Sequence, residues 1–372
     1  MQYLQTAKEV AHLAEKLGGV ILVAADTEAA GYHRYRDTIC LLQLSTRLDT
    51  YVIDTLAVPD PAPLAAVFAN PETEVVFHDA DYDLRLLNRD FGFAVKCLFD
   101  TKIAAQLIGE QAFGLGSLVQ KYLGITLEKK HQRADWAQRP LPQDMLLYAA
   151  EDTRHLPELR DRLRDELTKR GRLKWAEEEF QLARETRWEL SEEDDAFLRT
   201  KGARDLKPRE LAVLRELHAW REKAGESRDV AVFRVLSNET LLELSRRMPS
   251  RIAELSDIPG LGAGLIERRG EELLEAIQRA ARVEDAQLPR FPRHPRRPPP
   301  DAEFDARVDR LKAARDKAAD ALQLERGFLM PRQQLEDIAR AQPRNKEQLQ
   351  EVPHMRKWQV DAMGDALLGA LA

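Results

Sequence analysis

The chain has 372 residues, of which 44% are hydrophobic and 32% charged, a composition typical of a globular protein with two or three domains. The net charge of −6 argues against charge-driven, non-specific nucleic-acid binding, although local basic grooves remain compatible with it. The sequence contains no apolar run near the roughly 18 residues of a membrane span and no N-terminal signal pattern. Two cysteines are too few for a disulfide framework or a thiolate zinc site. We therefore expect a cytoplasmic protein with no membrane partner.

The first strong pattern follows a helix predicted at residues 2–17. Five apolar residues at 20–24 come after a Gly-Gly turn and predict a buried strand that ends near Asp26 and Glu28. Side chains alternate between the faces of a strand, so these two carboxylates are expected on one face. Adjacent carboxylates repel and tend to bind protons or hard cations such as Mg²⁺ or Mn²⁺. An Asp turn with an incidental Glu is the alternative.

The following elements continue the first domain, and their order predicts an α/β fold with a mixed sheet. A polar and aromatic loop at 29–37 leads into two strands joined by a tight turn, which we expect to extend the sheet in antiparallel fashion. The predicted strands are 39–45, 50–54, 74–78 and 95–99, and the predicted helices are 61–69, 81–90, 102–108, 116–123 and 142–170.

Two more acidic clusters lie on predicted helices. Asp79, Asp81 and Asp83 follow a strand and open a helix, where acids commonly serve as capping charges, although Asp83 sits one turn further in. Tyr148 and Asp152 are spaced i and i+4, which places them on one helix face. Each cluster by itself is more often structural than catalytic.

Taken together, these residues are far more specific. Asp-x-Glu on a strand, a later Asp and a Tyr-x3-Asp helix resemble the tyrosine-containing branch of the DEDD exonucleases. The segments at 39–45, 77–84, 99–101 and 135–141 are similar to those of ribonuclease D, and the resemblance covers about residues 5–170. It implies a ribonuclease H-like fold, with Asp26, Glu28, Asp83 and Asp152 as metal ligands and Tyr148 as the fifth catalytic residue.

The same resemblance implies the chemistry. Two divalent ions, Mg²⁺ or Mn²⁺, would activate water and stabilise the leaving oxygen. Asp26, Glu28 and Asp152 would hold the water-activating ion, and Asp26 with Asp83 the second. Tyr148 would orient the attacking water, because a phenol with a pKa near 10 is a poor base at neutral pH.

Candidate substrate contacts come from two groups of residues. A basic, aromatic loop suits base stacking and phosphate contact, and residues near the acids could hold the terminal nucleotide. Ordinary solvated charge and satisfied buried polar groups are the alternatives. The candidate substrate-binding residues are Gln43, Leu44, His78, His33, Arg34 and Arg36.

The rest of the chain is predicted to be helical. Its turn Ile258-Pro-Gly-Leu-Gly262 before a helix resembles HRDC domains, which assist nucleic-acid binding, and Val352-Pro echoes that turn. From Asp205 to Arg282 there are 14 basic and 14 acidic residues, so a protein-docking or architectural bundle remains the alternative. We assign residues 1–170 to the exonuclease domain, 171–204 to a helical connector, 205–286 to an HRDC domain, 287–300 to a Pro/Arg-rich linker, and 301–372 to a second HRDC-like domain.

The resemblance leads to a metal-dependent 3′→5′ exoribonuclease that releases nucleoside 5′-monophosphates. Its expected partner is the single-stranded 3′ end of structured RNA, with tRNA precursors and tRNA 3′ maturation implied, and we expect a monomer. The alternatives are a 3′→5′ DNA exonuclease in repair and a non-catalytic nucleic-acid-binding adaptor.

Overall fold

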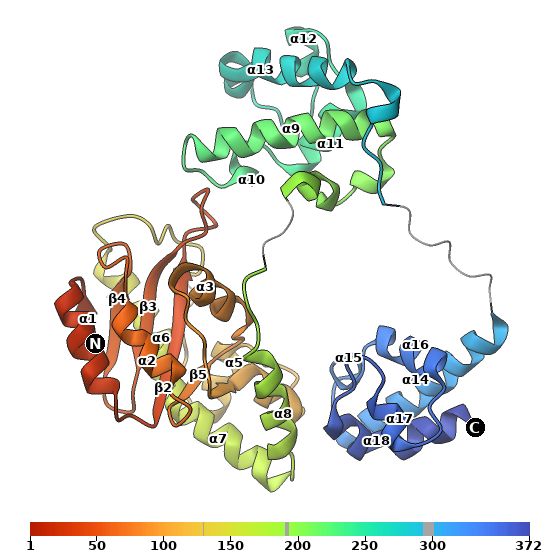
Figure 1. Cartoon of the computed structure of the whole chain (residues 1–372). Coiled ribbons are helices and arrows are strands. Elements are labelled where there is room, and N and C mark those ends of the chain that lie inside the picture. Colours follow the sequence, from red (N-terminus) through yellow and green to blue (C-terminus); the bar gives the residue numbers. More distant parts are fainter. Residues whose placement is uncertain (129, 190–192, 293–300) are drawn as a thin grey trace. The chain divides into compact units, whose positions relative to one another are not determined.

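The computed structural model describes residues 1–128, 130–189, 193–292 and 301–372, so part of the predicted linker at 287–300 lies outside it. The chain divides into two compact units (Figure 1). The first unit comprises Met1–Glu28, Ile39–Trp188 and Pro298–Ala372, and the second comprises Ala29–Thr38 and Glu189–Arg297. No described helix has the length and apolar character that crossing a membrane requires.

A six-stranded mixed sheet forms the centre of the first unit and confirms the predicted fold class. The strand order is β1-β4-β3-β2-β5-β6, with β3 antiparallel to β4 and the pairs β1–β4, β2–β5 and β5–β6 parallel. Because β2 is an interior strand, its residues are held by neighbours on both sides. The strands are β1 Gln2–Leu4, β2 Leu22–Ala29, β3 Ile39–Ser45, β4 Thr50–Asp54, β5 Glu74–Phe77 and β6 Leu98–Asp100.

The N-terminal residues correct one prediction. The helix expected from residue 2 begins only at Ala7, and Gln2–Leu4 form strand β1. Thr6 caps the start of the helix. Its hydroxyl accepts a hydrogen bond from the Glu9 amide, and the Glu9 carboxylate accepts one from the Thr6 amide. Five residues before this cap, of which three form the strand, are too few to show a strand by periodicity.

The prediction of a single helix over 142–170 is also wrong. The segment forms two helices that meet at His155, since Pro157 lies in the first turn of the second and cannot donate an amide hydrogen bond back into the first. The helices of this part of the unit are α1 Ala7–Leu17, α2 Ala65–Ala69, α3 Asp81–Phe91, α4 Thr101–Leu107, α5 Leu115–Leu123, α6 Gln143–Arg154, α7 Leu156–Lys169 and α8 Leu173–Ala183.

Among the described residues of the predicted helical connector at 171–204, the α-helical part is α8. Short 3₁₀ turns at Glu193–Arg199 and Ala203–Asp205 follow. The second unit then forms a helical bundle, which we call the first helical domain. Its core is the buried stripe of Leu211, Leu214 and Leu217 on α9. Its helices are α9 Pro208–Glu226, α10 Val232–Val235, α11 Asn238–Arg247, α12 Ile252–Leu255 and α13 Ala263–Ala281.

The C-terminal helices repeat this order of five and form the second helical domain. In the turn before the last helix, Gly260 of the first domain has φ +81° and His354 of the second has φ +63°. Both repeats therefore use a left-handed residue at one position, although only glycine adopts it without steric cost. The helices are α14 Ala302–Leu322, α15 Arg326–Leu329, α16 Arg332–Ala341, α17 Lys346–Gln350 and α18 Lys357–Leu371.

The second helical domain is fastened to α8 by its α18 N-terminus. The Glu178 carboxylate accepts hydrogen bonds from the Lys357 amide at 2.7 Å and the Trp358 amide at 3.0 Å. The Trp358 ring stacks on Trp175 with centroids 5.0 Å apart, and its indole N–H donates to Glu179 at 2.7 Å. The helix amides at this turn are therefore occupied by a carboxylate of the chain itself.

We expect Glu178→Ala to lower the free energy of unfolding of the first unit by about 1–2 kcal/mol, because two helix-terminal amides lose a charged acceptor. Thermal or urea melting measures this change. Glu177→Ala is the matched control, since Glu177 is an exposed acid on the same helix. Equal destabilisation by both substitutions would contradict a specific role for Glu178.

Candidate active site

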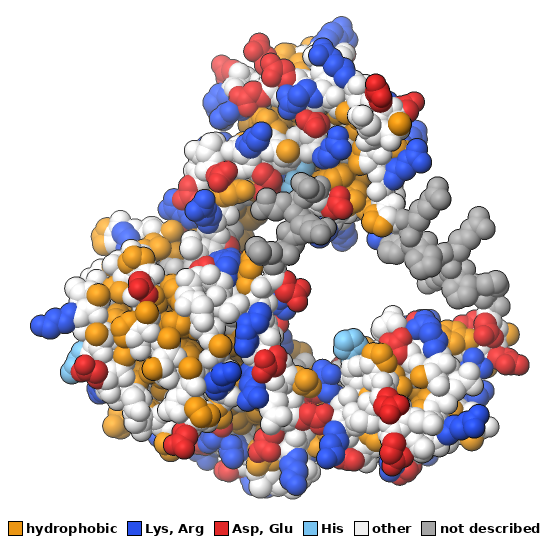
Figure 2. All heavy atoms as spheres, in the orientation of Figure 1, with side chains coloured by type: hydrophobic (Ala, Val, Ile, Leu, Met, Phe, Trp, Pro, Cys, Tyr) orange, Lys and Arg blue, Asp and Glu red, His pale blue; other side chains and the backbone are white. Residues whose placement is uncertain are grey.

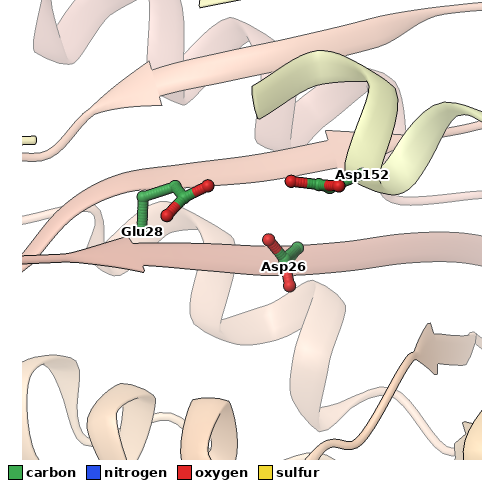
Figure 3. Close-up of side chains that lie close together, drawn as sticks. All are labelled: Asp26, Glu28 and Asp152. Atoms are coloured by element: carbon green, nitrogen blue, oxygen red, sulfur yellow. The ribbon is translucent and has the colours of Figure 1, made fainter. Parts of the chain in front are cut away.

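Three carboxylates meet where the central strand faces helix α6. Asp26 and Glu28 project from β2 and Asp152 from α6, and one oxygen of each lies within 4.8 Å of an oxygen of the other two (Figure 3). Strand alternation places the first two on one face, and packing of α6 against β3 and β4 brings the third over it. The structure thus assembles residues that are more than 120 positions apart in the sequence.

The electrostatics of this cluster favour a bound cation. Burial, followed by the charges of neighbouring acids, raises the pKa of Asp26 and of Glu28 well above their usual values. Burial and then the charge of Glu151 raise the pKa of Asp152 to about 7. Among the described residues, no lysine or arginine forms an ion pair with any of the three. Hard oxygen donors that repel one another fit a divalent metal ion, which would relieve the repulsion.

Asp83 occupies a different position from the other predicted ligands. It lies on α3, and its Oδ1 accepts hydrogen bonds from the Thr27 amide at 3.1 Å and the Thr27 hydroxyl at 2.5 Å. Burial raises the pKa of Asp83 to about 7, and its charge contributes to the raised pKa of Asp26. Asp83 is therefore tied to the strand between Asp26 and Glu28 but is outside the group of three, so its role as a metal ligand stays a prediction.

Tyr148 lies one helical turn before Asp152 and faces the same cavity as the acids. Burial and the charges of Asp152, Glu28 and Asp26 raise the pKa of its hydroxyl above the usual value. The hydroxyl therefore stays protonated at neutral pH and can donate a hydrogen bond but cannot act as a base. The rings of Trp136 and His131 pack against it, with centroids 6.1 and 5.7 Å away.

A cavity of about 380 Å³ opens beside these residues, which is room for one nucleotide-sized ligand. His78 lines it, and its Nδ1 lies 2.9 Å from the Thr101 hydroxyl, which itself donates to the Phe77 carbonyl. We therefore assign the proton to Nδ1 and an acceptor lone pair to Nε2. Burial lowers the pKa of His78 to about 4, so the ring is neutral at pH 7. Other described lining residues are Gly114, Leu115, Gly116, Ser117, Leu127, Glu128 and Gln132.

A substrate contact by Gln43 or Leu44 stays a prediction that their burial does not favour. Both are fully buried within β3, and neither lines the cavity, because β3 is an interior strand covered on both faces. The Gln43 side-chain amide has no hydrogen-bond partner among the described residues. A position near the acids in the sheet does not by itself expose a side chain to the cavity.

The basic loop predicted to bind phosphate lies in the second unit, against the first helical domain. Arg34 lies 3.5 Å from Asp229 and Arg36 lies 3.7 Å from Glu226. The His33 carbonyl accepts a hydrogen bond from the Ala231 amide at 3.2 Å. The two arginines are thus paired with acids of the chain, and contact between this loop and phosphate stays a prediction.

Sequence reasoning did not foresee two contacts that the structure places beside the site. Thr27 anchors Asp83, and a segment at 130–142 carries the rings that enclose Tyr148. Part of that segment, residues 135–141, was recognisable as a family motif, but its contacts depend on the tertiary fold.

The raised acid pKa values predict how metal-free stability depends on pH. With a folded pKa of about 7 against an ordinary value of 3.8, the Asp152 carboxylate destabilises the fold progressively as pH rises between these values, and the full penalty persists above pH 7. In EDTA, Asp152→Asn should therefore raise the free energy of unfolding at pH 8 by about 1–3 kcal/mol and leave it unchanged near pH 4. With Mg²⁺ at pH 8 the order should reverse. Melting curves with and without Mg²⁺ test this, and a pH-independent effect of the substitution would contradict it.

Comparison with known proteins agrees with this geometry. The sequence profile of the 3′-5′ exonuclease family matches residues 1–168, and that of the HRDC domain matches residues 210–277 and 304–371. The fold and site thus define a 3′→5′ exonuclease followed by two HRDC domains.

Curated relatives narrow this class. Ribonuclease D of Acidiphilium cryptum is 34% identical over 301 residues, covering 80% of this chain and 76% of that protein. Ribonuclease D of Escherichia coli is 32% identical over 289 residues, covering 77% of each. The crystal structure of the E. coli enzyme superposes with a TM-score of 0.74 at 28% identity over 100% of this chain and 98% of that one. The chain belongs to the ribonuclease D family and is a metal-dependent 3′→5′ exoribonuclease.

Proposed function

We propose that this protein trims the single-stranded 3′ ends of structured RNA, tRNA precursors in particular, and releases nucleoside 5′-monophosphates. The observation that carries the proposal is the cluster of Asp26, Glu28 and Asp152 beside a cavity of nucleotide size. The E. coli relative is described as an exoribonuclease involved in structured RNA processing. We further propose a monomer in the cytosol, which is consistent with Cys40 and Cys97 both being free thiols.

Two divalent ions, Mg²⁺ or Mn²⁺, are the proposed cofactors. Asp26, Glu28 and Asp152 would hold one, and Asp26 with Asp83 the other. Such ions, when bound, lower the pKa of water and stabilise negative charge on phosphoryl oxygens. The raised pKa values of these carboxylates are the expected signature of acids arranged for a cation.

The chain's own residues would position the reacting groups. The protonated Tyr148 hydroxyl can orient a water opposite the leaving 3′ oxygen of the penultimate nucleotide. Attack on phosphorus then breaks the P–O3′ bond and leaves the phosphate on the departing nucleotide. His78 lines the cavity, and its neutral Nε2 could accept a hydrogen bond from a hydroxyl group of the terminal ribose.

The first helical domain would contribute RNA binding through local contacts and not through a basic field. Its basic and acidic side chains are interspersed on the face drawn in Figure 2, in agreement with their equal numbers. We therefore expect weaker salt dependence of RNA binding than a strongly basic domain gives.

A time course with 3′-tailed RNA and DNA hairpins, each in Mg²⁺, Mn²⁺ and EDTA, tests the proposal. Stepwise, metal-dependent shortening of the RNA tail that stalls near the stem would support it. Equal or faster digestion of DNA would instead favour a repair exonuclease. Binding without cleavage of either substrate would leave only an adaptor.

A further inference from the structure

Arg139, near the end of the segment at 130–142, makes polar contacts with both its own segment and the sheet. Its guanidinium forms a two-point ion pair with Asp54 at the end of β4, at 2.8 and 2.7 Å. It also donates to the carbonyl oxygens of Trp136 and Gln138, both at 2.7 Å, and of Cys40 at 3.2 Å. One side chain therefore fixes its own segment to two strands of the sheet.

The Asp54 end of this contact is built into the protein interior. Asp54 is 1% exposed and also accepts hydrogen bonds from the Tyr3 hydroxyl and the Leu56 and Ala57 amides. Burial alone would raise the pKa of Asp54, but the hydrogen bonds from Arg139 and Tyr3 hold it below the usual value. A buried carboxylate with this many donors defines the position of its arginine partner.

The segment that Arg139 fixes packs against the Tyr148 ring through Trp136, and we call this packing surface the Trp136 wall. Trp136 is 2% exposed, and its ring lies 6.1 Å from the Tyr148 ring at 32°. Its indole N–H has no hydrogen-bond partner among the described residues, so burying this ring carries a polar cost that packing must offset. On another side, the His131 ring meets Tyr148 edge-on, and its Nε2 lies 3.0 Å from Asp144.

We propose that Arg139 is a positioning residue for Tyr148, acting through Asp54 and the Trp136 wall to hold the tyrosine hydroxyl at the carboxylate cluster. Arg139 has no described contact with Asp26, Glu28 or Asp152, so it acts through the tyrosine and not on the acids. The inference rests on the proposed role of Tyr148 and adds the part of the fold that fixes it. A misplacement of about 1 Å in such a group can cost up to a hundredfold in rate.

A double-mutant cycle tests this inference. Single-turnover cleavage of a 3′-tailed RNA would be measured for the wild type, Arg139→Gln, Tyr148→Phe and the double variant, with RNA affinity measured in parallel. We expect Arg139→Gln to slow cleavage roughly ten- to a hundredfold at unchanged affinity. In the Tyr148→Phe background the same substitution should cost less than about twofold, because the group it positions is already gone. Arg139→Lys keeps the charge but loses the two-point contact with Asp54. Its cleavage rate should fall between those of the wild type and Arg139→Gln.

Two further variants separate positioning from general destabilisation. Arg160→Gln removes a comparable ion pair, with Glu74 on β5, and should leave the cleavage rate within about twofold of wild type. If Arg139→Gln fails to fold, Asp54→Asn/Arg139→Gln removes the unpaired buried charge and takes its place in the cycle. Equal costs of the Arg139 substitution in both backgrounds, or no cost at all in an active enzyme, would overturn the proposal. An inactive wild type would instead overturn the proposed function.

Discussion

Asp26→Asn should abolish RNA hydrolysis and leave RNA binding intact. Asp26 lies at the junction of the carboxylate cluster, on the central strand, and the charges of Glu28, Asp83 and Asp152 all act on it. Replacing it with a neutral amide removes the one ligand that both proposed cations share. We expect the single-turnover rate to fall by at least about a thousandfold.

Gel assays with a labelled 3′-tailed hairpin measure the rate, and filter binding measures the affinity. Asp81→Asn is the matched control, because Asp81 forms a surface ion pair with Arg85 on α3 and lies outside the cluster. It should retain activity within about twofold. A fully active Asp26→Asn protein would falsify the assignment of this cluster as the catalytic centre.

Tyr148→Phe should slow hydrolysis by about 10²- to 10⁴-fold without weakening RNA binding. The substitution removes one hydroxyl and keeps the ring that packs against Trp136 and His131. Because that hydroxyl stays protonated, its loss should lower the rate at every pH between 6 and 9 by a similar factor and should not shift the midpoint of the pH profile.

Tyr122→Phe provides the control for a lost tyrosine hydroxyl. Tyr122 lies on α5, and its hydroxyl donates to Glu110 at 2.6 Å. We expect a loss of stability of about 1 kcal/mol and no loss of rate. If both tyrosine variants slowed cleavage equally, the effect of Tyr148 would be one of stability and not of water orientation.

The pattern of the sequence was enough to predict the fold class and the three carboxylates that the structure brings together. The apolar run at 20–24 with acids at 26 and 28 specified a strand with two carboxylates on one face, because strand alternation is a local property. The i, i+4 spacing of Tyr148 and Asp152 is equally local. The HRDC turns could be recognised for the same reason, because the turn before the last helix is specified by a few adjacent residues.

Only the tertiary structure decided what the neighbours of those residues are. The sequence cannot show that β3 is interior and buries Gln43 and Leu44, nor that acids at 226 and 229 pair with Arg36 and Arg34. The contact between Arg139 and Asp54 joins residues 85 positions apart. Burial and ion pairing depend on which segments pack together across the whole chain, and no local periodicity records that choice. Short sequence motifs therefore identify the acids and their chemistry, whereas the positions of these acids depend on the folded protein.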